Sequence, residues 1–460
     1  MYPRSLMFAA GAIGASIALW SAPANAFCGF YVSKADAKLF NKASKVIVAR
    51  KGRRTVITMA SDYQGDPKEF ALVVPVPTVI KRNQINLTTN KLVDHLDAYT
   101  APRLVEYHDR NPCAPQPERM ASMKRATSSV PMTTSRRDRA KSLGVKIEAQ
   151  YTVGEYEILI LSAKQSDGLS TWLNESGYKI PGKAKPVLAS YIRQDMKFFV
   201  AKVDLEKKKT LGFNYLRPIQ VAFENSKFML PIRLGTVNAN GPQDMLMFML
   251  TERGRVETTN YQTKRIPSNL DVPIYTRDEF GKFYKAMFDH QVKKDGMRAV
   301  YLEYAWNMAW CDPCAADPIP NKKLVELGAY WLIDKAAGNQ SRRRLFRRRG
   351  GGPQNVFVTR LHVRYDAKSF PEDLKFQETS DRKNFQGRYI LRHPYKGPAI
   401  CDAAERYKAM VAERRRKAAH NLANMTGWKL GDIHKRMQLS KFDARDSAWY
   451  ERMWGREGNK

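Results

Sequence analysis

Apolar and polar residues alternate over short stretches in much of this chain, a period-two pattern typical of β-strands. Two β-branched runs within residues 44–60 flank Lys51-Gly52-Arg53 and predict a hairpin. Residues 69–77 predict a third strand. Pro75 and Pro77 have no N–H to donate, so this strand should lie at a sheet edge or end there. Further strands are predicted in residues 145–163 and in "KFFVAKVDL", "LRPIQVAF", "KFMLPIRL" and "DMLMFMLTE".

Helical periodicity is confined to a few segments. Residues 90–101 predict a short helix that ends before Pro102, and residues 166–178 and 277–292 predict two more. The segment that begins at Cys401 predicts a long amphipathic helix. We expect it to pack on the body through Tyr407, Met410 and Val411. This mixture predicts an α+β fold: a strand-rich mixed body with several short helices and a C-terminal amphipathic helix.

Changes in composition divide the chain into six regions. These are a signal peptide (1–26), an N-terminal strand-rich region (27–113), a polar flexible loop or linker (114–144), a central α+β region (145–290), a region with a C-x-x-C pair and a basic loop at 341–352 (291–400), and a basic helical tail (401–460).

The first residues predict export. An apolar run at 6–20 follows Arg4 and is followed by Ala24 and Ala26 in an A-x-A arrangement, which is typical of a secretory signal peptide cleaved near Ala26. We therefore expect a periplasmic or secreted protein. No later stretch is long and apolar enough to predict a membrane span. Residues 299–310, which contain Glu303, predict a buried segment instead.

The charge is extreme for a chain that has 43% hydrophobic residues and thus ample material for a core. The formal net charge is +33, and removal of the signal peptide would take away only Arg4. Such a charge attracts polyanions. Outside the cytoplasm, anionic lipid, lipopolysaccharide or an acidic envelope polymer is a nearer partner than nucleic acid. Two clusters are candidates for binding an anionic surface: Arg342, Arg343, Arg344, Arg347, Arg348 and Arg349, and Arg414, Arg415 and Arg416. The alternative is a solvated loop that tolerates charge.

Five cysteines follow the signal peptide: Cys28, Cys113, Cys311, Cys314 and Cys401. In an oxidising compartment most should be paired, and the odd number leaves one free or joined to another chain. The pair Cys311 and Cys314 allows three interpretations. A redox pair needs a following helix, which the prolines of "AADPIP" oppose. A zinc site usually needs a second such pair, and the sequence has none. A structural disulfide is therefore favoured, either between Cys311 and Cys314 or through bridges to the distant cysteines.

Searches for catalytic motifs find no zinc-hydrolase helix, no nucleophile elbow and no phosphate-binding loop. No metal site and no cofactor are predicted. The leading hypothesis is a non-catalytic, disulfide-stapled envelope protein that engages an anionic component. The alternatives are a thiol-disulfide oxidoreductase that uses Cys311 and Cys314, and a hydrolase whose site one sequence does not reveal.

Seven segments together resemble a known bacterial family. They are "FCGFYVSKADAKLFNKAS", "MASDYQGDPKEFALVVPVP", "LILSAKQSDGLSTWL", "FFVAKVDL", "LPIRLGTVNANGPQDMLMFML", "AWCDPCAADP" and "FQGRYILRHPY". From about Phe27 to Cys401 the chain is similar to exported proteins described as domain of unknown function 2330. The resemblance implies export and one shared architecture, and brings no activity, substrate or catalytic residue. It also implies a disulfide framework, because the family pattern includes cysteines like Cys28, Cys113, Cys311 and Cys314.

Overall fold

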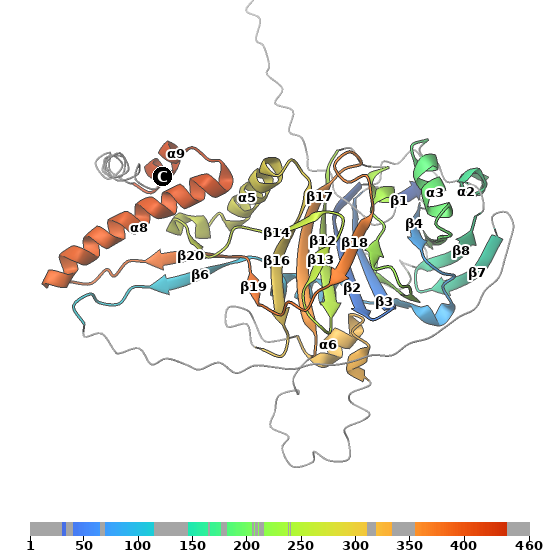
Figure 1. Cartoon of the computed structure of the whole chain (residues 1–460), viewed down its shortest axis with the longest axis horizontal. Helices are drawn as coiled ribbons and strands as arrows, with labels where there is room; N and C mark the ends of the chain where they lie inside the picture. The colour runs from blue at the N-terminus through green and yellow to red at the C-terminus, as the bar shows by residue number, and fades with distance from the viewer. Residues whose placement is uncertain are drawn as a thin grey trace, which may run out of the picture.

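Figure 1 shows the computed structural model of the chain. The described residues are 30–33, 40–64, 70–114, 146–163, 166–175, 182–204, 207, 210, 216–237, 239, 241–310, 319–333 and 355–438. The predicted signal peptide, Cys28, the Cys311 and Cys314 pair, the basic loop at 341–352 and residues 439–460 lie outside these ranges.

A nine-stranded mixed sheet forms the centre of the described structure. It begins with the predicted hairpin, whose two-residue loop Gly52-Arg53 has a φ of +61° at Gly52, a conformation that glycine adopts without strain. Strands from three of the predicted regions (27–113, 145–290 and 291–400) contribute to this sheet. Strand β2 pairs in parallel with β12, which pairs with β17. Its members are β14 (Gln262–Arg265), β16 (Ala299–Asn307), β17 (Phe357–Tyr365), β12 (Gln243–Thr251), β2 (Phe40–Lys51), β3 (Arg54–Gln64), β10 (Ile219–Glu224) and β5 (Ile85–Leu87), with β19 (Phe385–Gln386) paired to β16.

A five-stranded sheet packs against one face of the nine-stranded sheet. In spatial order it contains β1 (Phe30–Ser33), β4 (Phe70–Val76), β9 (Lys197–Val203), β8 (Tyr156–Ser162) and β7 (Lys146–Val153). The sequence predicted that β4 lies at a sheet edge or ends at its prolines. It does end at Val76, but it lies inside the sheet rather than at its edge. Within the described residues, β1 pairs with β4 from Phe70 to Val73, so no described residue of β1 lies opposite Pro75, which has no N–H to donate.

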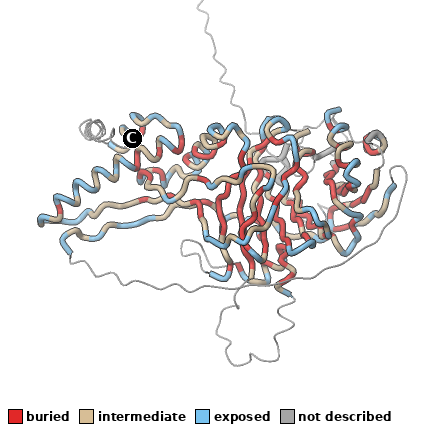
Figure 2. The backbone as a smooth tube through the Cα atoms, in the orientation of Figure 1, coloured by how far each residue is buried: buried red, intermediate tan, exposed pale blue. Residues whose placement is uncertain are grey.

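The layers follow from alternation along the strands. On β2, Val46 and Val48 face the five-stranded sheet, whereas Ile47 and Ala49 face a layer of helices. That layer contains α1 (Asn90–Thr100), α6 (Asn321–Glu326) and the fully buried Trp331. The far face of the five-stranded sheet is covered by α2 (Ser166–Glu175) and α3 (Ala184–Ile192). The result is a helix–sheet–sheet–helix stack, with buried residues concentrated in its middle (Figure 2).

A second unit extends from the edge of the main body (Figure 1). Its three-stranded sheet contains β15 (Leu270–Asp271), β20 (Arg388–His393) and β6 (Arg103–His108), all parallel. It packs with α5 (Phe280–Lys294), α8 (Asp402–Thr426) and α9 (Leu430–Arg436) around one apolar cluster. The remaining elements are η1 (Arg82–Gln84), η2 (Arg233–Thr236), η3 (Ile274–Arg277) and a small sheet of β11 (Met229–Leu230), β18 (Leu374–Glu378) and β13 (Val256–Thr258).

The predicted α+β class is confirmed, and the helices expected near 90–101, 166–178 and 277–292 are present as α1, α2 and α5. The expected contacts of α8 are wrong in part. Met410 is 51% exposed, and the helix instead buries its second half, through Ala418, Ala419, Leu422 and Met425. The reason is that α5 and β15 cover only that half. No helix in the described part of the chain has the length and apolar character that a membrane span requires.

Candidate functional site

A basic cleft opens where α3, the β10–β11 connection, η2 and β18 meet. Its volume is about 710 Å³. Four cationic side chains line it, Arg193, Lys227, Arg233 and Lys375, together with Ser190, Gln194, Phe228, Met229, Glu372, Asp373 and Phe376. We call this space the basic cleft.

Asp373 holds the walls of the basic cleft together. It is only 5% exposed. Its Oδ1 accepts hydrogen bonds from the Tyr191 hydroxyl (2.6 Å), from the backbone N–H of Ile232 (2.9 Å) and from that of Arg233 (3.2 Å). Burial and the Asp373 charge raise the pKa of Tyr191 well above its usual value, so its phenol stays protonated and donates. One carboxylate thus joins α3, η2 and the start of β18.

Arg233 is fixed in place, whereas two other cations are free to meet a ligand. The Arg233 guanidinium lies 3.4 Å from Asp373 Oδ2, donates to Ser190 Oγ at 2.7 Å and lies over the Tyr191 ring. Arg193 and Lys227 are exposed and form no ion pair with any described carboxylate. Lys375 pairs with Glu372 at 2.7 Å on the surface, a contact of little strength in water. The Asp373 carboxylate already accepts hydrogen bonds from the walls of the cleft. The cleft therefore presents an excess of positive charge to a ligand.

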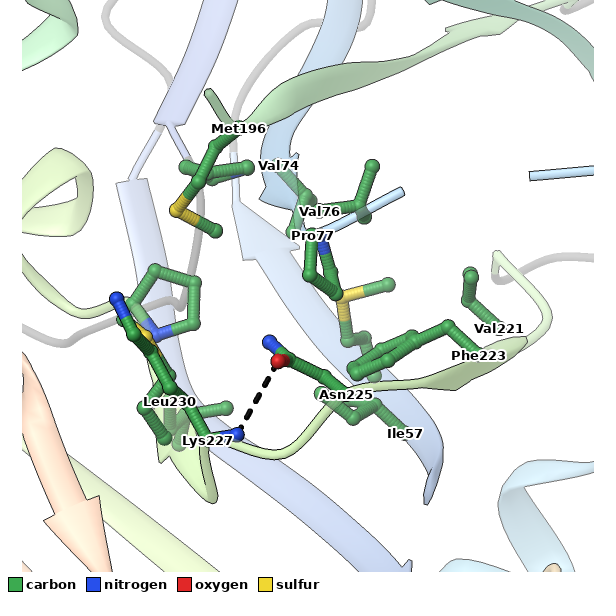
Figure 3. A pocket seen from close by; sticks show the side chains of 14 residues that line it. Ile57, Val74, Val76, Pro77, Met196, Val221, Phe223, Asn225, Lys227 and Leu230 are labelled. Atoms are coloured by element: carbon green, nitrogen blue, oxygen red, sulfur yellow. Dashed lines mark hydrogen bonds between the residues drawn. The ribbon is translucent and has the colours of Figure 1, made fainter. Parts of the chain in front are cut away.

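An apolar crevice lies beside the basic cleft, between residues of the two large sheets (Figure 3). Lys227 and Met229 line both spaces. The crevice is lined by Ile57 and Met59 of β3, Val74 and Val76 of β4, Val221 and Phe223 of β10, and by Pro75, Pro77, Met196, Asn225, Leu230 and Pro231. Its volume of about 30 Å³ is close to that of one water molecule in the liquid. One cation, Lys227, therefore lines a crevice whose other walls are mostly apolar.

The polar groups of the basic cleft have the chemistry of a site that binds anions. The Ser190 hydroxyl, the one described hydroxyl group that lines the cleft, donates to the Val187 carbonyl at 2.6 Å and accepts from Arg233. Neither contact is with a base that could activate it as a nucleophile. The arrangement can attract an anion through charge and receive an apolar group next to it.

Most residues predicted from the sequence for a site lie outside the described ranges. Cys28, Cys311, Cys314 and the arginines between 342 and 349 belong to that set, so their proposed roles stay predictions. Of the second arginine cluster, Arg414 pairs with Asp109 and Arg416 with Glu413, while Arg415 donates to the Met437 carbonyl. They lie on α8, in the second unit, and none of them lines the basic cleft.

Cys113 and Cys401 form a disulfide. They are 288 residues apart in sequence, and the bond joins the segment after β6 to the residue that precedes α8. Nearby, the Tyr407 hydroxyl and the Arg414 guanidinium both donate to Asp109, so polar contacts and the disulfide fasten the same end of α8. The expectation that structural disulfides staple this chain is thus confirmed for one pair.

Loss of this disulfide should destabilise the protein. We expect Cys113→Ser/Cys401→Ser to lower the free energy of unfolding by roughly 2–4 kcal/mol, because the bond restricts a long loop in the unfolded chain. Urea denaturation of the variant and the parent measures the difference. Mild reduction of the parent should reproduce the loss. An unchanged denaturation midpoint in the double variant would contradict this expectation.

A bacterial family matches most of the chain. Its sequence pattern, described as "uncharacterized protein conserved in bacteria", domain of unknown function 2330, matches residues 22–377. The chain belongs to this family. The matched range contains every residue that lines the basic cleft and the apolar crevice. Strand β20, helices α8 and α9, and Cys401 lie after the end of the match. No curated protein and no solved structure matches the chain.

Sequence reasoning missed the basic cleft. Its four cations come from segments between residues 193 and 375, and none stands in a run of charge that draws attention. A signal was available in "KFMLPIRL", where Lys227 and Arg233 flank an apolar stretch. By itself that pattern predicts only a strand, because nothing along the chain shows that Arg193 and Lys375 lie beside it.

Proposed function

We propose that this protein is an exported, non-catalytic binding module whose basic cleft and apolar crevice together hold an anionic amphiphile of the cell envelope. The anionic group, a phosphate or carboxylate, would lie among Arg193, Lys227 and Arg233. The apolar portion would enter the crevice beside Lys227. The observation that carries this proposal is that a cationic and an apolar space share Lys227 and Met229 as walls.

The two spaces differ in how much they can hold. The basic cleft, at about 710 Å³, lies within the range of ligand pockets. The crevice, at about 30 Å³, accepts only the end of an apolar chain until side chains move. Three methionines line it, Met59, Met196 and Met229. Unbranched, flexible methionine side chains adapt to ligands of different shape.

Export is part of the proposal and rests on other residues. The apolar run at 6–20, followed by Ala24 and Ala26, supports secretion. The disulfide between Cys113 and Cys401 suits an oxidising compartment. In the envelope, phosphorylated and carboxylated amphiphiles are abundant, and the formal net charge of +33 would concentrate the protein near them.

Charge reversal in the basic cleft should weaken binding to anionic vesicles. We expect Arg193→Glu/Lys227→Glu to reduce affinity for phosphatidylglycerol vesicles at least ~10-fold, because each basic residue near such a surface contributes about 1 kcal/mol. Vesicle co-sedimentation at low and high salt measures the effect. Neutral phosphatidylcholine vesicles should bind neither protein, and salt should weaken the binding of the parent.

A matched control variant distinguishes binding at the basic cleft from attraction by the net charge of the protein. Lys91→Glu/Lys322→Glu makes the same change in charge on exposed positions of α1 and α6, on the opposite side of the nine-stranded sheet. It should retain most of the affinity. A short-chain phosphatidylglycerol should also bind more tightly than glycerol phosphate, which lacks the apolar part. Equal losses in the two double variants, or equal affinity for the two ligands, would contradict the proposed site.

A further inference from the structure

Two histidines and a glutamate converge at the outer end of the second unit. Glu106 and His108 are two residues apart on β6, so their side chains lie on the same face of the strand. His393 ends β20 and lies opposite His108 in the parallel register. Figure 1 shows β6 and β20 side by side where they extend from the main body.

The three side chains are already in contact. His393 Nε2 lies 2.6 Å from Glu106 Oε2. The rings of His108 and His393 are stacked, with their centres 4.4 Å apart and their planes 9° from parallel. One possible ligand atom from each of the three residues lies within 4.8 Å of the others. Ligand atoms bonded at about 2.0–2.2 Å to one tetrahedral ion lie roughly 3.4 Å apart, so binding requires the three atoms to draw together. It also requires the stacked rings to rotate until their nitrogens point at a common ion.

The geometry points to a binding site for one divalent transition-metal ion of the zinc class, with Glu106, His108 and His393 as its ligands. Imidazole nitrogen with one carboxylate oxygen is a donor set that suits zinc and its neighbours. Calcium and magnesium prefer oxygen donors throughout and are disfavoured here. Glu106 and His108 are exposed, so water can complete the coordination.

Neighbouring charges do not oppose a cation strongly. Arg277 lies 3.9 Å from Glu106 and also pairs with Asp278 at 3.3 Å. Two further arginines of this unit have carboxylate partners of their own, Arg392 with Asp271 and Arg414 with Asp109. Each of these three guanidinium groups thus has a carboxylate partner, and Arg277 divides its charge between Asp278 and Glu106.

A backbone hydrogen bond and a disulfide hold β6 and β20 in register. The backbone N–H of Asp109 donates to the His393 carbonyl at 2.9 Å, which continues the pairing beyond the ligands. Just beyond, the Cys113–Cys401 disulfide ties together the two segments that leave the strands. The two strands that carry the ligands are therefore fixed before an ion arrives, so binding has to order only the three side chains, which lowers its conformational cost.

Zinc titration of the untagged mature protein tests the site. Free thiols are first alkylated, with the disulfide intact, so that cysteine does not contribute. Competition with a chromophoric chelator should reveal one saturable site per chain. We expect His108→Ala, His393→Ala and Glu106→Gln each to weaken zinc binding at least ~100-fold, since even changes to residues behind the ligands cost 10–100-fold. Cobalt substitution should give an absorption spectrum typical of nitrogen and oxygen ligands.

Tyr107→Ala is the matched control. Tyr107 lies between the two β6 ligands, points to the other face and is 43% exposed, so the variant keeps the ligand set. It should bind zinc like the parent. Glu106 and His108 are exposed, so their variants should fold, and thermal unfolding without metal verifies this. The proposal is overturned if no saturable site exists, or if folded Glu106→Gln and His108→Ala proteins bind zinc as tightly as the parent.

Discussion

Replacement of Glu303 by glutamine should destabilise the protein by about 3 kcal/mol or more. Glu303 lies on β16, is 0% exposed and forms the centre of a buried charge network. Its Oε2 accepts from Arg360 Nε at 2.5 Å, and its Oε1 accepts from His362 Nδ1 at 2.7 Å and from the Tyr284 hydroxyl. Breaking a buried ion pair from one side typically costs 3–5 kcal/mol, because the remaining charge loses its compensation.

A β-bulge lies at Glu303. The register between β16 and β17 shifts between Leu302 and Tyr304, so Glu303 has no direct partner on β17. Alternation places Glu303 on the helix-covered face, opposite Val300 and Leu302, where α1 and α5 lie. The bulge lets Tyr304 face the same side before Ala305 returns to the core between the sheets. From α1, Asp97 accepts from the other side of the Arg360 guanidinium at 2.5 Å. The network therefore joins two central strands to two helices.

Urea denaturation of Glu303→Gln and of the parent measures the loss. The glutamine keeps the size of the side chain, so the comparison isolates the charge. Glu224→Gln is the control, because Glu224 pairs with Arg54 on the surface with both side chains more than half exposed. That variant should change the free energy of unfolding by less than about 1 kcal/mol. If both variants lose the same stability, the buried network is not a major support of the fold.

Lowering the pH should remove the contribution of Glu303 to the free energy of unfolding. Burial alone would raise the pKa of the Glu303 carboxyl, but the charges of Arg360 and His362 and the hydrogen bonds it accepts lower it to about 2 from 4.5. The folded state thus binds this proton less readily than the unfolded state does. The stabilisation is fully present above about pH 4.5 and is lost as the pH falls toward 2, with a total of about 3 kcal/mol.

The dependence of stability on pH separates Glu303 from other acids. The pKa values of Asp97, Asp295 and Asp366 are also lowered in the folded state, so the parent should lose stability steeply below about pH 5. In Glu303→Gln the slope between about pH 4 and pH 3 should be shallower by most of one proton. Parallel curves for the parent and Glu303→Gln would contradict the lowered pKa.

Local patterns in the sequence predicted many of the elements of this fold. The β-branched runs around Gly52 form the β2–β3 hairpin, and the periodic segments form α1, α2 and α5. The apolar stretch around Glu303 predicted a buried segment, and β16 lies there. These predictions succeed because the period of apolar residues follows from the geometry of a single strand or helix, whatever it packs against.

The sites were decided by tertiary structure alone. Glu106 and His393 meet because β6 pairs in parallel with β20, and no feature near either residue indicates that pairing. In the same way, the basic cleft needs Arg193, Lys227 and Lys375 from three separate elements. The sequence by itself thus determined the α+β class and the family. Only folding decided which polar groups converge, because strand pairing depends on long-range packing rather than on local periodicity.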